Sequence, residues 1–196
     1  MRDAVRPVRR GVRRVRYEGG EFMVTAGPEG QSDIEPGTYE IEPGASTVRF
    51  ATRAMFGLVP VRGSFALREG RVTVSEPVEE SSVEVVIDAG GFDSGNRKRD
   101  EHVKSADYLD AAAHPGIAYR GTGVSRTAEG ATLQGELTVK GVTRPVAVTV
   151  GAVAVEGRRL TARGTATVDR YAFDITTAKG MTGRRLTLTL DIVASR

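Results

Sequence analysis

Apolar and polar residues alternate along most of the chain after residue 37, with the period of two that is typical of half-buried β-strands. In one such segment Val48 and Phe50 fall on one face, and Arg49 falls on the other. Segments of this kind recur about eight times, separated by turn sequences that contain Gly or Pro. Almost all are apolar on one face only, whereas the strands of parallel sheets are apolar on both faces. The pattern therefore predicts an antiparallel all-β domain.

The predicted strands raise the question of how the sheet protects its edges. An open antiparallel sheet leaves a row of unpaired backbone groups at each edge, and these groups promote aggregation. Closure into an up-and-down β-barrel removes both edges, so a barrel of about eight strands is the favoured prediction. A sandwich of two sheets remains the alternative, because alternation alone does not distinguish the two architectures.

One stretch departs from the alternation and predicts a helical insertion near residues 96–111. Ser94 or Asn96 is suited to cap its first turn. Asp100 and Lys104 have the i,i+4 spacing of a favourable ion pair. The insertion is the one convincing helix in the sequence.

The apolar residues of the insertion lie along one narrow stripe formed by Val103, Ala106 and Leu109. Pro115 limits any extension of the helix beyond the insertion. We expect the helix to cover one end of the barrel as a lid, with Val103, Tyr108 and Leu109 facing the interior.

The inward positions of the predicted strands include many small residues and almost no ionisable group, so the contents of the barrel should be apolar. A barrel of about eight strands is just wide enough to be filled by side chains or to hold one small ligand. Small inward residues either leave room for a cavity or relieve crowding where backbones approach closely, and the sequence leaves both interpretations open. These residues are Gly63, Ala89, Gly121, Gly135, Ala162, Gly164 and Ala166.

Charge divides the first part of the chain from the rest. The first 16 residues carry a net charge of +6, residues 17–37 carry −5, and the whole chain carries +3. We expect residues 1–37 to form a flexible, basic-then-acidic arm and residues 38–196 to form the barrel domain. No apolar run approaches the about 20 residues that span a bilayer, and no signal-peptide pattern opens the chain. A cytoplasmic location is therefore predicted.

The arm suggests an alternative function, in which it docks to an anionic membrane or a nucleic acid and the barrel serves as a scaffold. No aromatic residue lies among its arginines to stack on bases. Nucleic acid is thus disfavoured as a partner, and contact with an anionic membrane is expected to be weak.

Few residues in the sequence suit catalysis, because the chain has two histidines and no cysteine. His102, Ser105 and Asp107 are the residue types of a hydrolase triad, but they lie too close along one helix to converge. His102 and His114 lack the spacing of a metal site. We predict no enzymatic activity, no catalytic residue, no metal ion and no cofactor other than a bound isoprenoid-type lipid.

Residues 99–110, Arg-Asp-Glu-His-Val-Lys-Ser-Ala-Asp-Tyr-Leu-Asp, followed by His-Pro-Gly-Ile at residues 114–117, resemble the "RDxHLxSxDFxD…xPxI" signature of the YceI-like family of polyisoprenoid-binding, lipocalin-like proteins. Residues 61–65 resemble its "VxGxF" strand. Residues 135–146 and 169–175 resemble its "GxLTIxGVTxPV" hairpin and "xRxxFGI" segment. The four motifs occur in the family's order.

The resemblance implies a lipocalin-like antiparallel barrel that binds a long isoprenoid or isoprenoid-quinone chain in its lumen and that forms a homodimer. The implied function is binding, transport or sequestration of that chain. The residues expected to contact it lie on the inward faces, at the bend after the first long strand, or on the lid; they are Val48, Phe50, Phe56, Phe65, Val85, Ile87, Val103, Tyr108, Leu109, Ile117, Tyr119, Leu137, Val148, Phe173 and Leu188.

Overall fold

The computed structural model describes residues 12–17, 20–25, 34–127 and 130–196 of the 196-residue chain. The chain divides into two units, Met1–Ile34 and Glu35–Arg196, and each is described by itself.

The first unit contains an antiparallel hairpin of β1 (Val12–Tyr17) and β2 (Gly20–Thr25). This hairpin was not predicted from the sequence. The rest of the predicted flexible arm before residue 34 lies outside the described residues.

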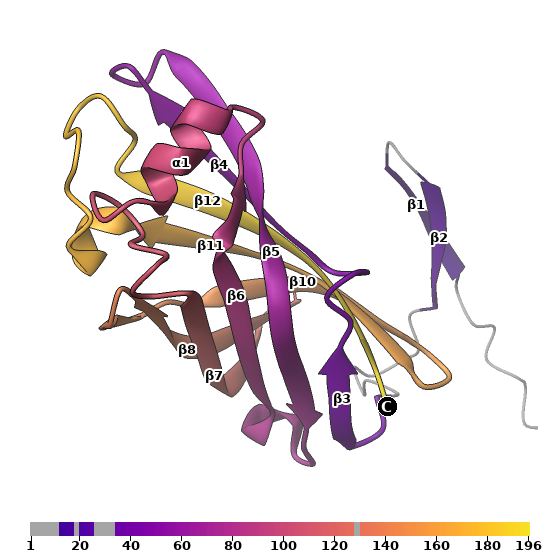
Figure 1. Ribbon diagram of the computed structural model, residues 1–196. Helices are drawn as coiled ribbons and strands as arrows, with labels where there is room; N and C mark the ends of the chain where they lie inside the picture. Colours follow the sequence, from indigo (N-terminus) through magenta and orange to yellow (C-terminus); the bar gives the residue numbers. More distant parts are fainter. Residues whose placement is uncertain (1–11, 18–19, 26–33, 128–129) are drawn as a thin grey trace, which may run out of the picture. The chain divides into compact units, whose positions relative to one another are not determined.

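The second unit is built from one sheet with antiparallel neighbours, accompanied by one α-helix and two short 3₁₀ helices among the described residues (Figure 1). The helices are α1 (Arg97–Lys104), η1 (Val78–Glu80) and η2 (Arg170–Phe173). The ten strands of the sheet are β3 (Gly37–Ile41), β4 (Thr47–Ala54), β5 (Val59–Val74), β6 (Ser82–Asp93), β7 (Gly116–Thr127), β8 (Gly130–Val139), β9 (Val142–Pro145), β10 (Val148–Glu156), β11 (Arg159–Asp169) and β12 (Arg185–Ser195).

The sheet closes on itself because β10 pairs with β8 as well as with β11. Val148 lies opposite Leu133 in the closing ladder. The ten strands occupy about eight positions around the ring, since β3 and β4 both lie between β12 and β5, and β9 and β10 both pair with β8. The predicted all-β, antiparallel barrel is confirmed, and the alternative of two separate sheets is excluded.

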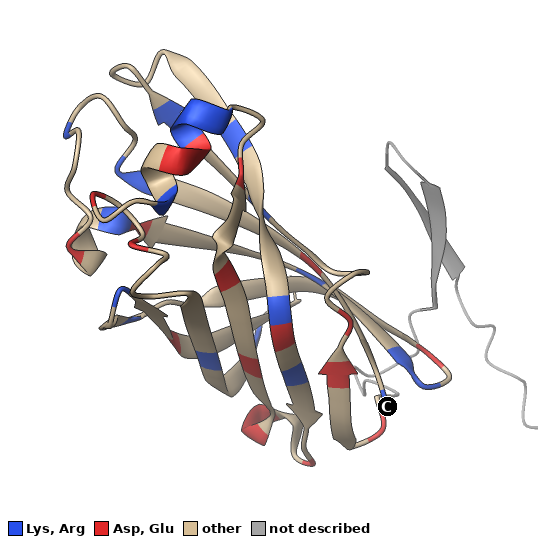
Figure 2. Ribbon diagram, viewed as in Figure 1, with Lys and Arg blue, Asp and Glu red and all other residues tan. Residues whose placement is uncertain are grey.

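Cross-strand ion pairs occupy the outer face of the barrel, where charged residues follow the strands (Figure 2). Glu84 on β6 pairs with Arg71 on β5 and with Arg120 on β7, the latter at 2.7 Å. The hydrogen bond from Arg71, reinforced by Arg120, lowers the pKa of the Glu84 carboxyl below its ordinary value. These pairs join neighbouring strands in register and keep the charged face in water.

One end of the barrel interior is filled by side chains. Leu133, Val148 and Ala166 form a buried cluster, and Tyr119 packs against it. A Cβ added at Gly135 would lie 2.5 Å from the Tyr119 hydroxyl oxygen, and one added at Gly121 would lie 2.7 Å from the Leu133 side chain. Glycine at these positions relieves crowding, so the interpretation that they open a cavity is wrong.

The helical insertion is shorter than predicted. Helix α1 begins after Asn96, whose side-chain oxygen accepts a hydrogen bond from the Arg99 amide at 3.1 Å, so Asn96 is the N-cap. The helix ends at Lys104 rather than near residue 111. Beyond it the chain runs through turns that bury Tyr108 and Leu109, which a continued helix would not place on the same side.

The polar contacts of α1 also differ from the expected ones. The predicted ion pair between Asp100 and Lys104 is wrong, because Asp100 accepts hydrogen bonds from the amide and hydroxyl of Ser94. The i,i+4 pair is instead formed by Arg97 and Glu101 at 2.9 Å. Asp100 thereby fastens the first turn of α1 to the chain segment that leaves β6.

Candidate ligand-binding site

A cavity of about 310 Å³ occupies the end of the barrel interior opposite the packed cluster, beneath α1. Three phenylalanines gather on one side of it: the ring centroids of Phe50 and Phe92 are 5.0 Å apart, and Phe65 lies 5.7 Å from Phe50 and 5.2 Å from Phe92. Contacts of this kind stabilise the cluster beyond the area that it buries. Most of the remaining lining is aliphatic, so the cavity suits an apolar ligand.

Eleven of the predicted contact residues line this cavity. They come from six strands, from the lid and from η2, and their side chains converge although they are distant in sequence. These residues are Val48, Phe50, Phe65, Ile87, Val103, Tyr108, Leu109, Ile117, Leu137, Phe173 and Leu188.

Four of the predicted residues lie elsewhere. Phe56 is 78% exposed at the tip of the β4–β5 hairpin, because the bend turns it outward. Val148 belongs to the packed cluster, and Tyr119 packs against that cluster. Val85 lies opposite Gly70 on β5 and Tyr119 on β7. It is the next inward residue after Ile87 on β6 and lies further from the lid. Alternation gave the correct face for the last three residues but not their level along the barrel.

The hydroxyl group of Tyr119 is hydrogen-bonded at the packed end of the barrel. The hydroxyl donates to the carbonyl oxygens of Val146 at 3.2 Å and Leu133 at 3.4 Å. Burial raises the pKa of Tyr119 to about 12, since the charged phenolate would lose its water.

Three basic residues line the cavity, in contrast to the expected apolar lumen: Arg99, His102 and Arg170. Arg170 is 5% exposed, and sequence reasoning missed it as a lining residue. Its guanidinium donates to the carbonyl oxygens of Gly183 at 2.9 Å, Ile175 at 2.6 Å and Thr182 at 3.1 Å. Its position as the Arg of the "xRxxF" segment was the one available signal.

Arg170 thus fixes the loop between η2 and β12 from beneath. The guanidinium also lies 4.8 Å from the ring centroid of Tyr171 and 5.8 Å from that of Tyr108. The buried charge is stabilised by carbonyl dipoles and aromatic faces, and this arrangement joins the loop to the lid.

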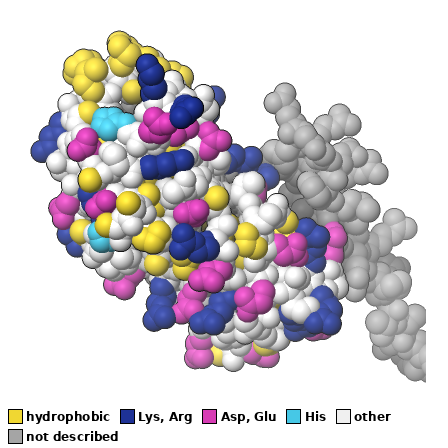
Figure 3. Space-filling view, viewed as in Figure 1, with side chains coloured by type: hydrophobic (Ala, Val, Ile, Leu, Met, Phe, Trp, Pro, Cys, Tyr) yellow, Lys and Arg dark blue, Asp and Glu magenta, His cyan; other side chains and the backbone are white. Residues whose placement is uncertain are grey.

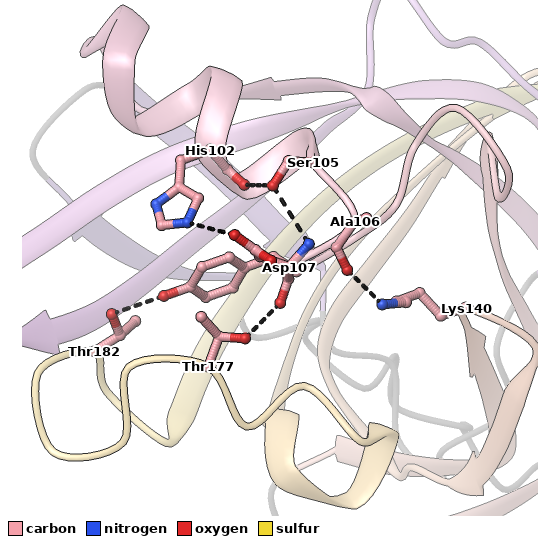
Figure 4. Close-up of polar contacts among 8 residues, drawn as sticks. His102, Ser105, Ala106, Asp107, Lys140, Thr177 and Thr182 are labelled. Carbon is pink, nitrogen blue, oxygen red and sulfur yellow. Dashed lines mark hydrogen bonds and ion pairs between the residues drawn. The ribbon is translucent and has the colours of Figure 1, made fainter.

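The segment that follows α1 is tied to two sides of the barrel mouth, as Figure 4 shows. Lys140, in the turn between β8 and β9, donates to the Ala106 carbonyl at 2.9 Å. Thr177 donates its hydroxyl to the Asp107 carbonyl at 2.6 Å, and the hydroxyls of Tyr108 and Thr182 lie 3.2 Å apart. The lid therefore closes this end of the barrel through fixed polar contacts.

The residues that resemble a hydrolase triad make other contacts. Ser105 donates its hydroxyl to the backbone carbonyl of His102 at 2.7 Å, which ends the helix (Figure 4). The Asp107 carboxylate lies 3.2 Å from Nε2 of His102. The imidazole packs edge-on against the Tyr108 ring, with the two ring centroids 5.1 Å apart. Ser105 and His102 are thus joined through the backbone and not through the imidazole, so these side chains hold the lid in place.

The model of the YceI-like domain matches residues 39–194. The chain belongs to the YceI-like domain family. The UPF0312 protein of Ectopseudomonas mendocina is 34% identical over 124 residues, which is 60% of this chain and 65% of that protein. The YceI protein of Escherichia coli O157:H7 is 34% identical over 86 residues, or 43% of this chain and 44% of that protein. The chain thus matches less than two thirds of the length of these curated relatives.

Solved structures show the same fold at low sequence identity. Burkholderia cenocepacia BcnA is 22% identical and superposes with a TM-score of 0.69, covering 79% of this chain and 99% of its own. A polyisoprenoid binding domain from Saccharophagus degradans is 12% identical with a TM-score of 0.61, covering 82% of this chain and 99% of its own. The YceI-like barrel of residues 39–194 is therefore shared with these proteins.

Among the described residues, no helix has both the length and the apolar character needed to cross a bilayer.

Proposed function

We propose that this YceI-like barrel binds the apolar chain of an isoprenoid-type lipid, such as an isoprenoid or an isoprenoid quinone, and thereby carries or sequesters it. The observation that supports this proposal most directly is the apolar cavity beneath a fixed lid. The polyisoprenoid binding domain of Saccharophagus degradans has the same fold and points to the same class of ligand.

The size of the cavity suggests how much of such a chain is held. Its volume of about 310 Å³ is at the lower end of the range of about 300–1,000 Å³ that is typical of ligand pockets. Burial of each methylene group stabilises a bound chain by about 0.8 kcal/mol, so one five-carbon unit contributes up to about 4 kcal/mol before ordering costs. We infer that the lumen holds the end of a long chain and that the remainder extends through the mouth.

A polar head group on a short-chain ligand would meet Arg99 and His102, which line the cavity beneath α1. Arg99 is positioned by two hydrogen bonds to Ser94, one to its hydroxyl at 2.7 Å and one to its carbonyl at 2.9 Å. The imidazole of His102 offers a further donor or acceptor. This pair suits a ligand whose head group accepts hydrogen bonds, as a quinone does.

Native mass spectrometry of the purified protein, followed by titration with geranylgeraniol, tests the proposal. Leu137→Trp places a large ring in the cavity and is expected to abolish binding, because Leu137 lines it. Ala118→Trp is the control, since Ala118 is exposed on the neighbouring strand β7 and pairs with Thr138. Equal binding by both variants, or no binding by the unmodified protein, would contradict the proposal.

The homodimer, the cytoplasmic location and weak docking of the arm to anionic membranes stay predictions. The arm carries its charges before residue 38, largely outside the described residues.

A further inference from the structure

Large apolar side chains are exposed at the end of the barrel that carries the lid (Figure 3). We call this set the apolar rim; its members are Met55 at 52% exposure, Phe56 at 78%, Leu58 at 79%, Val59 at 41% and Met181 at 45%. The first four belong to the β4–β5 hairpin, and Met181 belongs to the loop that precedes β12. Val153 on β10, at 44%, is the other large exposed apolar residue of the described chain.

The backbone holds the rim side chains outward. Met55 and Phe56 have φ values of 50° and 57°, a conformation that costs free energy for residues with a Cβ. Two backbone hydrogen bonds maintain it, from the Met55 amide to the Met181 carbonyl at 2.6 Å and from the Phe56 amide to the Gly180 carbonyl at 3.1 Å. The hairpin tip and the loop therefore form one platform that presents apolar groups to the exterior.

The platform adjoins the mouth of the cavity. Ala54 immediately precedes the rim in sequence and lines the cavity, and it forms a β-bridge with Thr182, which also lines the cavity. The rim thus directly adjoins the lining of the cavity. A chain that extends from the mouth at this point would pass beside the rim.

The two segments that form the rim carry charged groups of one sign. Residues 53–62 and 175–185 contain five basic residues and no carboxylate. Arg184 pairs with Asp169 at 2.6 Å. The other four form no ion pair with any described residue: Arg53, Arg62, Lys179 and Arg185.

We propose that the apolar rim inserts into the interface of an anionic lipid bilayer, so that the mouth of the lumen opens against the membrane. Exposed aromatic and aliphatic side chains beside basic residues are the features of an interfacial anchor. A symmetric contact between two copies of the rim would instead bring like charges together. Docking by the rim rests on the proposed function in one respect: it identifies the membrane as the place from which the isoprenoid chain would enter the lumen.

Vesicle flotation of the full chain tests the rim. The probes are vesicles of phosphatidylcholine alone and of phosphatidylcholine mixed with phosphatidylglycerol. The double variant Phe56→Ser/Leu58→Ser is expected to lose at least about tenfold in affinity for the anionic vesicles, because two large anchors are removed. Val153→Ser removes the large exposed apolar side chain that lies outside the rim, on β10, and should bind as the unmodified protein does.

Charge is tested by the variant Arg53→Gln/Arg62→Gln, which is expected to weaken binding to anionic vesicles and to leave the weak binding to neutral vesicles unchanged. Circular dichroism and thermal unfolding verify that each variant is folded. Titration with geranylgeraniol in the absence of vesicles reports the lumen separately, and the rim variants should bind it normally.

These measurements separate the failure of docking from the failure of chain binding. A protein that binds geranylgeraniol but floats equally well with and without the rim side chains would overturn membrane docking by the rim and assign any vesicle binding to another part of the chain. A dimer that becomes a monomer in Phe56→Ser/Leu58→Ser, without any vesicle binding, would overturn it in favour of a contact between two copies. A protein that floats in a rim-dependent manner but never binds geranylgeraniol would leave the docking intact and refute the proposed function.

Discussion

The packing of Gly135 against the neighbouring strand β7 gives a sharp test of how the barrel interior is divided. A Cβ at this position would lie 2.5 Å from the Tyr119 hydroxyl oxygen and 2.6 Å from the backbone carbonyl oxygen of Arg120. The carbonyl belongs to the ladder in which Gly121 pairs with Gly135, so it cannot move without disturbing the sheet. We predict that Gly135→Ala destabilises the protein.

The expected magnitude follows from the cost of overpacking, which is about 1–3 kcal/mol for added carbon atoms in a well-packed interior. For a chain of this size each kcal/mol corresponds to about 2–4 °C in melting temperature. Gly135→Ala should therefore lower the melting temperature by about 2–12 °C.

Gly123→Ala on β7 is the matched control, because nothing lies within 4 Å of the position of its added Cβ. Replacing glycine by alanine at an unstrained position stabilises a protein by about 0.4–1 kcal/mol through the unfolded state. The control should therefore unfold at the same temperature as the unmodified protein or slightly above it.

Thermal and urea unfolding of both variants, with geranylgeraniol titration of the folded proteins, provides the assay. Gly135 does not line the cavity, so chain binding by the folded Gly135→Ala protein should be normal. Equal stability of Gly135→Ala and Gly123→Ala would contradict close packing at Gly135. A stable Gly135→Ala protein that lost chain binding would show instead that Gly135 borders the lumen.

Two further predictions concern buried polar groups. Arg170→Met should destabilise the protein by about 2–5 kcal/mol, because the carbonyls of Gly183, Ile175 and Thr182 lose their donor. Urea unfolding measures the loss of stability. Arg170→Lys should recover only part of it, since an ammonium group lacks the planar set of donors of a guanidinium. Tyr119 makes the free energy of unfolding depend on pH. Its pKa is about 12 in the folded protein, against an ordinary value of 10.0. Its contribution to stability is therefore complete below pH 10.0 and is lost as the pH rises towards 12. Tyr119→Phe should lose stability less steeply between those pH values in urea unfolding, and identical slopes would contradict the assignment.

The sequence was sufficient to predict the class of the sheet, because the period of two is a local property of each strand. Closure was favoured only by the need to protect the edges of the sheet. The face of Val48 or Leu188 follows from that period alone. That β3 and β4 both pair with β12 and β5 does not follow from the period. This shared pairing depends on contacts with strands far away in the sequence.

The candidate site was predictable to the extent that it depends on the same period. Val48 and Val148 are both buried, yet one lines the cavity and the other belongs to the packed cluster. Alternation specifies the face of a strand but not the level along the barrel axis, so it could not separate them. Gly135 illustrates the same limit, since a small inward residue indicates open space or close packing with equal validity until its neighbours are known.

The burial of Arg170 could not be predicted from the hydropathy pattern, for a different reason. A charged residue after a strand is expected at the surface, and its burial is favourable only because three backbone carbonyls from residues 175–183 surround it. That segment has no periodic pattern from which its path could be predicted. Only the family motif that contains Arg170 signalled its importance.

The distribution of contacts around the mouth indicates where a ligand enters. The lid is anchored by side chains on two sides, through Lys140 and Thr177, and Arg170 fastens the loop from beneath. The hairpin tip is held to that loop by two backbone hydrogen bonds and one β-bridge, so the tip and the loop form one unit. A chain that leaves a bilayer along the apolar rim would therefore reach the lumen at the edge of this unit, beside Ala54 and Thr182, which line the cavity.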